Sequence, residues 1–171
     1  MKIPADALPR GKRVVTPYVL SNDASGFIDF LRAAFDAHEF GRVENPDGKI
    51  GHAEVQVGDS TIMVVDSREE WQDFPAFLSV YVDDADEVFE KAIDAGATVV
   101  TQMQDSRILG DRGGRVCDPF GNIWWIQTHH AEVSPAEAWE YFQDPVEQRI
   151  MQNAQETFIA AMDARYRRDV R

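Results

Sequence analysis

The chain has 171 residues, of which 44% are hydrophobic, and a formal net charge of −13. This length suits one domain or two small modules that share a core. The negative charge disfavours nucleic acid and anionic membranes as partners. No apolar run is long enough to cross a membrane and the first residues do not form a secretory signal, so we expect a cytoplasmic protein. Cys117 is the only cysteine, which excludes an intrachain disulfide.

The first part of the chain alternates strand and helix signals. After an irregular lead-in at residues 1–13, a β-prone segment spans residues 14–20. Asp23 then offers helix-capping chemistry, and the apolar residues that follow it have helical spacing: Phe27, Phe30, Leu31 and Phe35. Two further strands, 52–57 and 61–66, are joined by a Gly-Asp turn.

The second part repeats this order. A strand at 77–82 is followed by a helix that begins near Asp84 and ends at Gly96. A strand begins at Val99, residues 110–114 form a predicted loop, and the last two strands are 115–117 and 123–128. The turn between those two strands is tightly specified by its sequence, Asp118-Pro119-Phe120-Gly121.

The two parts align at a constant offset of 61, because Asp23 matches Asp84 and Ile62 matches Ile123. We therefore predict an α+β fold with two strand-helix-strand-strand-strand (βαβββ) modules, residues 14–70 and 71–130. Side by side, the modules would form a curved mixed sheet, with helices on its convex face and a cleft on its concave face.

Residues 131–171 form a predicted helical tail. Ser134 and Glu137 make a capping box with proline between them, and Asp144-Pro145 begins a second helix. The second helix carries an apolar stripe: Val146, Ile150, Ala154, Phe158, Ala161 or Met162, and Tyr166. We expect this stripe to pack on its own module or on a second subunit.

The duplicated order resembles the vicinal oxygen chelate superfamily, which includes glyoxalase I, bleomycin-resistance proteins, extradiol dioxygenases and fosfomycin-resistance proteins. The resemblance covers residues 14–130 and rests also on Asp23 with residues 28–30 and on residues 118–121. Within the superfamily the chain is most similar to the PhnB-like branch, through these segments: 16–18, 51–54, 81–84, 110–112 and 124–129.

In metal-dependent members, each module supplies two ligands, typically His, Gln or Glu. The resemblance places these positions at Thr16, Val64, Phe77 and Trp125, none of which is a useful ligand for a divalent metal. A register shift of one residue brings no better donors. We therefore expect no metal at the family site and no cofactor. His52 and Glu54 share a strand face, but no third ligand is evident.

Every second side chain of a strand points to the same face, so residues two or four positions from these four should also line the cleft. They are Tyr18, Asp66, Ser79, Tyr81, Ile123 and Gln127. This aromatic lining suits a planar or amphipathic organic molecule. The alternative is that the aromatic residues fill a collapsed cleft. Trp124 has the opposite parity and is predicted to lie in the core beneath a helix.

Asp66 is the first candidate for a general base, because an apolar cleft would raise its pKa, and His52 is the second. Structural hydrogen bonding is the alternative role for both. Arg112 is a candidate for binding a carboxylate at the cleft mouth, or for pairing with an acidic residue. The predicted ligand-binding residues are Thr16, Tyr18, His52, Val64, Asp66, Phe77, Ser79, Tyr81, Arg112, Trp125 and Gln127.

We consider three functions. The first is a metal-free protein of the resistance or sequestration type that binds a small molecule and forms a homodimer, as superfamily members commonly do. The second is an enzyme, either a metal-independent isomerase or lyase using Asp66 or His52, or a metalloenzyme with relocated ligands. The third is a module whose tail helix binds a partner protein. The sequence names neither the ligand nor a reaction.

Overall fold

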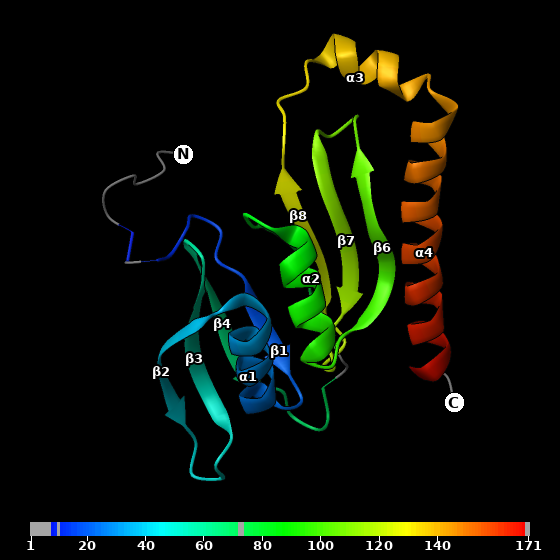
Figure 1. Ribbon diagram of the computed structural model, residues 1–171. Helices are drawn as coiled ribbons and strands as arrows, with labels where there is room; N and C mark the ends of the chain where they lie inside the picture. Colours follow the sequence, from blue (N-terminus) through cyan, green and yellow to red (C-terminus); the bar gives the residue numbers. More distant parts are fainter. Residues whose placement is uncertain (1–7, 10, 72–73, 170–171) are drawn as a thin grey trace.

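The computed structural model of the chain describes residues 8–9, 11–71 and 74–169 (Figure 1). The first module consists of β1 (Tyr18–Ser21), α1 (Ala24–Phe35), β2 (His38–Glu44), β3 (Ile50–Val57) and β4 (Ser60–Asp66). The second consists of β5 (Phe77–Tyr81), α2 (Ala85–Asp94), β6 (Thr98–Ser106), β7 (Asp111–Cys117) and β8 (Ile123–His129). The tail forms α3 (Pro135–Phe142) and α4 (Pro145–Asp169). Most of the predicted lead-in lies outside the described residues.

The strands form two four-stranded mixed sheets, with the orders β1-β4-β3-β2 and β5-β8-β7-β6. β1 and β5 run parallel to β4 and β8, and the other neighbours are antiparallel. This arrangement confirms the predicted α+β class with two βαβββ modules. We expected one curved sheet, but the strands form two separate sheets, which we call the first and the second sheet. The loop predicted at 110–114 is mostly part of β7.

Helices α1 and α2 lie next to each other and cover one face of each sheet, which we call the inner face (Figure 1). Both helices begin at a capping aspartate. Asp23 accepts a hydrogen bond from the Gly26 amide (2.9 Å), and Asp84 accepts one from the Glu87 amide (3.0 Å). Sequence spacing and capping therefore define both helices as predicted.

Trp124 joins the two modules. It is 2% exposed, and its ring centroid lies 4.6 Å from that of Phe35 on α1. The ring of Phe27 contacts both Trp124 and Phe120. The predicted core position of Trp124 is confirmed, and the helix above it belongs to the other module.

The turn before β8 is built around the buried Asp118. Its carboxylate accepts hydrogen bonds from the backbone amides of Phe120 and Asn122, the Asn122 side chain and the Trp124 indole, all at 2.8–2.9 Å. Gly121 closes the turn at a φ of 89°, where a side chain would be strained. The motif fixes both the turn and the position of Trp124 in the core.

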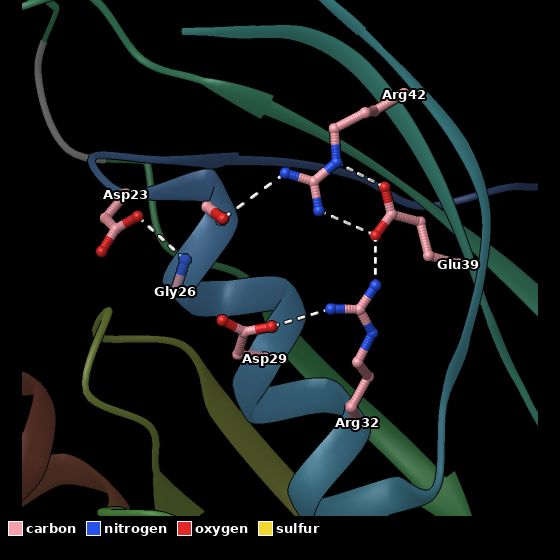
Figure 2. A network of polar contacts seen from close by, with 7 residues as sticks. Asp23, Gly26, Asp29, Arg32, Glu39 and Arg42 are labelled. Carbon is pink, nitrogen blue, oxygen red and sulfur yellow. Dashed lines mark hydrogen bonds and ion pairs between the residues drawn. The ribbon is translucent and has the colours of Figure 1, made fainter. Parts of the chain in front are cut away.

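On the first module, β2 is tied to α1 by an ion-pair network (Figure 2). The Glu39 carboxylate accepts hydrogen bonds from Arg42 on its own strand and from Arg32 on α1. Arg32 also donates to Asp29, one helical turn earlier. The hydrogen bonds and charge of Arg42, followed by the charge of Arg32, lower the pKa of Glu39 below its ordinary value.

The internal repeat has two offsets rather than one. Val19 of β1 pairs with Val64 of β4, whereas Val80 of β5 pairs with Ile126 of β8. The equivalent residues of β1 and β5 are therefore 61 positions apart, and those of β4 and β8 are 62 positions apart. Hydrogen bonds confirm the second offset, because Asp66 binds the Ala24 amide and Thr128 binds the Ala85 amide (both 2.8 Å). A shift of one residue exchanges the faces of a strand. The predicted orientation of Val64 and Asp66 toward the cleft is therefore wrong.

Helix α4 packs on the second sheet, across the face opposite α2, which we call the outer face. Phe158 stacks on Phe77 at 4.9 Å between ring centroids, and Thr157 hydrogen-bonds Thr101. Near the end of the helix, Arg165 donates to the Gly121 carbonyl (2.5 Å). The tail therefore packs on its own module, one of the two predicted arrangements; Tyr166 lies beyond the described side chains.

No helix in the described part of the chain has the length and hydrophobicity to cross a membrane.

Candidate functional site

A cavity of about 370 Å³ lies between the outer face of the second sheet and α4. The sheet contributes Phe77 and Trp125 to its walls, and α4 contributes Ile150, Ala154 and Phe158. These apolar side chains come from the stripe predicted on the tail helix and from the predicted cleft positions of β5 and β8. The site therefore exists only where the tail covers the second module.

The floor of the cavity is formed by β7, whose outer-face positions are Asp111, Gly113 and Arg115. A Cβ atom at Gly113 would lie 2.7 Å from the Ile126 carbonyl oxygen and 2.8 Å from Gln127 Cγ, too close for any side chain. Glycine therefore lets Gln127 and the β8 backbone approach β7 closely, between an acidic and a basic residue.

Arg115 lies directly beside Trp125 on the neighbouring strand, and its guanidinium carbon is 4.4 Å from the indole centroid. This distance is typical of a cation–π contact. Nη1 donates a hydrogen bond to the Ala154 carbonyl of α4 (2.6 Å). Arg115 is only 9% exposed, and this burial lowers its pKa.

Asp111 forms the polar end of the cavity. Its carboxylate accepts a hydrogen bond from the Tyr81 hydroxyl (3.0 Å) and contacts His129 Nδ1 at 2.6 Å. The Asp111 carboxylate raises the pKa of His129 above its ordinary value. Partial burial and the same carboxylate raise the pKa of Tyr81. Two neighbouring groups thus contact the Asp111 carboxylate.

The predicted cleft residues of the second module share the outer face as expected. Strand pairing sets Phe77, Ser79 and Tyr81 beside Ile123, Trp125 and Gln127. Phe77, Trp125 and Gln127 line the cavity, and Gln127 donates a hydrogen bond to Ser79 (2.7 Å). Five of the predicted ligand-binding residues therefore belong to this face.

The predicted residues of the first module do not line this cavity. Tyr18 and His52 lie on the outer face of the first sheet, 6.2 Å apart between ring centroids. His52 Nε2 is 3.3 Å from Glu54, which also binds Lys12. Thr16 precedes β1 and donates to the Arg13 carbonyl. Within one chain, the two sets of predicted residues form two surfaces and not one cleft.

Three predicted site residues have structural roles instead. Val64 is fully buried in the core under α1. Asp66 accepts hydrogen bonds from the Ala24 amide (2.8 Å) and the Ile50 amide (2.6 Å), one on each carboxylate oxygen. Arg112 forms a two-pronged ion pair with Asp86, as in the alternative given for it, and these contacts raise its pKa. Asp66 consequently has no free oxygen directed at a cleft.

The family metal site can be tested on these positions. With the corrected offset, the residue of β4 that matches Trp125 is Met63, so the set becomes Thr16, Met63, Phe77 and Trp125. These side chains do not fit a divalent metal, which requires imidazole or carboxylate donors. In the described residues, no cluster of three or more His, Cys, Asp or Glu side chains is placed to hold one.

Sequence reasoning missed Arg115 and the contribution of α4. Arg115 was placed on a strand, but its face was not considered. Counting back by two from Cys117 gives Arg115, Gly113 and Asp111 as one face, a signal that was available. The apolar stripe of the tail predicts packing on its own module or on a second subunit, and it does not indicate that a cavity forms there.

The sequence model of the Glyoxalase/Bleomycin resistance protein/Dioxygenase superfamily matches residues 13–126, and the chain belongs to this family. Helices α3 and α4 lie beyond the matched region.

Among individual proteins, the chain is similar to Mb0911c of Mycobacterium bovis, with 37% identity over 131 residues, 70% of this chain and 86% of the relative. It is also similar to the crystal structure of TioX from Micromonospora sp. ML1, with 26% identity and a TM-score of 0.58, covering 67% of this chain and 97% of TioX. The structure of PA1353 from Pseudomonas aeruginosa shares the fold, with a TM-score of 0.59 at 18% identity, covering 68% of this chain and 98% of PA1353.

Proposed function

We propose that this protein binds a small organic molecule in the cavity between the second sheet and α4. The observation that carries the proposal is a hollow of about 370 Å³, open to solvent and walled by aromatic and aliphatic side chains with few polar groups. Ligand pockets typically have this size and composition. The PhnB-like motifs at residues 16–18 and 51–54 support a place in that branch of the family.

Binding without turnover is the version that the residues favour. The proposed general base Asp66 is bound to two backbone amides, and the family ligand positions hold Thr16, Met63, Phe77 and Trp125. His52, the second candidate, lies on the first sheet, away from the cavity lining. An enzyme would therefore need groups that the sequence did not suggest.

The proposal is tested with two aromatic probes of nearly equal shape, naphthalene-2-carboxylate and naphthalene-2-carboxamide. Binding is followed through the indole N–H signal of Trp125 in NMR spectra, assigned with Trp125→Phe. We expect a Kd of about 0.01 to 1 mM for at least one probe, as suits a molecule of this size.

A blocking variant localises the binding. Ala154→Phe adds a ring to the cavity from α4 and should weaken binding at least about tenfold, because it removes the space that the probe occupies. Ala160→Phe, at an exposed position of the same helix, is the matched control. The proposal fails if neither probe shifts Trp125, or if Ala154→Phe binds as the wild type does.

A further inference from the structure

Among the described residues, Arg115 is a buried cation without an anionic partner. It is 9% exposed, and none of its hydrogen bonds goes to a carboxylate: Nη1 contacts the Ala154 carbonyl and, at 3.5 Å, the Thr101 hydroxyl. Nε is buried with no hydrogen-bond partner among the described residues. Removing a charge from water is costly unless it is paired, so an arginine in this state indicates a missing anion.

The other charge of the cavity does not supply that anion. Asp111 is the only other ionisable residue in the described lining, and it is engaged by Tyr81 and His129. Gly113 separates it from Arg115 on β7. Among the described residues, the site therefore has a hydrogen-bonded carboxylate at one end and, beside its aromatic wall, a guanidinium with no carboxylate partner.

The surroundings of Arg115 define the rest of the ligand. The guanidinium lies between aromatic rings, 4.4 Å from the centroid of Trp125 and 5.7 Å from that of Phe158. An anion that reaches this guanidinium must also contact the apolar walls. The cavity volume suits a molecule with one or two fused rings.

We propose that the ligand is an amphipathic organic anion, with an aromatic or aliphatic body and a carboxylate or similar group bound by Arg115. This inference rests on the proposed function and adds to it the charge class of the ligand. A planar guanidinium is well suited to a carboxylate, because it presents parallel N–H donors.

The charged and neutral naphthalene probes test the inference. We expect wild-type protein to bind naphthalene-2-carboxylate at least about tenfold more tightly than naphthalene-2-carboxamide, since a hydrogen bond to a charged group contributes about that factor. In Arg115→Met the carboxylate should lose this advantage, so that the two probes bind within about twofold of each other.

Two further variants serve as controls. Arg107→Met also removes one positive charge, but Arg107 lies outside the cavity, stacked on Tyr141, so the preference for the carboxylate should remain. Arg115→Lys keeps the charge and should retain part of the preference even if Arg115→Met folds poorly.

The outcomes separate the two proposals. Equal binding of both probes by wild-type protein, or an unchanged preference in Arg115→Met, overturns the anion inference and leaves the binding function intact. A loss of thermal stability in Arg115→Met with no change in preference would assign Arg115 only to the support of α4, which also overturns it. Absence of binding by either probe overturns the proposed function itself.

Discussion

Arg115 and Asp66 show how neighbouring groups decide what a charged side chain does. Asp66 meets two backbone amides and becomes part of the scaffold, because each of its carboxylate oxygens accepts a hydrogen bond, one from the start of α1 and one from the start of β3. Arg115 meets two aromatic rings and a single strong hydrogen-bond acceptor, the Ala154 carbonyl. The second environment leaves part of the charge unsatisfied, which is the condition expected of a binding residue.

His129 gives a prediction that depends on pH. The Asp111 carboxylate stabilises the protonated form of His129, so the pKa of His129 should be above its ordinary value. Protonation of His129 should therefore stabilise the fold. The sign follows from linkage: this contribution is complete below the unfolded pKa of about 6.5 and is lost as the pH rises through the raised folded pKa. An NMR titration of the His129 imidazole measures it directly.

Asp111→Asn is the test of the cause. It should bring the pKa of His129 down toward its ordinary value and flatten the dependence of the melting temperature on pH above about 6.5. His129→Gln identifies the resonance and should flatten the same dependence. An unchanged pKa in Asp111→Asn would show that this carboxylate is not responsible.

At the level of elements, α4 supplies the wall that the family fold lacks. The family match ends at residue 126, before either tail helix begins. Without α4, the rings of Phe77 and Trp125 and the Arg115 side chain would lie on an uncovered sheet face. The tail therefore covers one face of the family-matched fold and forms one wall of the cavity.

Deleting residues 134–171 tests this role. We expect the two modules to keep their secondary structure, because the core beneath α1 and α2 does not include the tail. Binding of the naphthalene probes should fall at least about tenfold, since the cavity loses one side. Circular dichroism checks folding and the Trp125 signal checks binding. Wild-type affinity in the truncated chain would contradict the assignment of α4 to the site.

For the whole molecule, the two sheets are not equivalent. Helix α4 packs on the outer face of the second sheet, although Phe77 and Tyr81 on that face are still 51% and 59% exposed. On the outer face of the first sheet, Tyr18 and Val43 are 49% and 64% exposed. His52 lies between them on the same face. We interpret this exposed apolar surface as a dimer interface, in line with the homodimer expected from the family resemblance.

We therefore predict a dimer in solution, with twice the 19.3 kDa mass of one chain by light scattering after size exclusion. Val43→Glu should shift the mass toward the monomer, because it places a charge on the apolar face. Val99→Glu, an exposed valine on the second module, is the control. A monomeric wild type at about 0.1 mM would contradict the prediction, given that specific dimers commonly bind more tightly than this.

The sequence by itself determined the modules, their capped helices, the Asp118 turn and the apolar stripe of the tail, because each depends on local chemistry or on a short repeat. It also determined that Phe77 and Trp125 lie on the same face of β5 and β8.

Only the tertiary structure decided the rest. A repeat offset of 61 in one part and 62 in another cannot be distinguished by matching residue types, yet it turns Val64 and Asp66 to the opposite face. The meeting of Arg115 with Trp125 and Phe158 joins residues from two strands and a helix, and depends on where α4 packs. Long-range packing, which local patterns do not encode, thus placed a buried positive charge in the cavity.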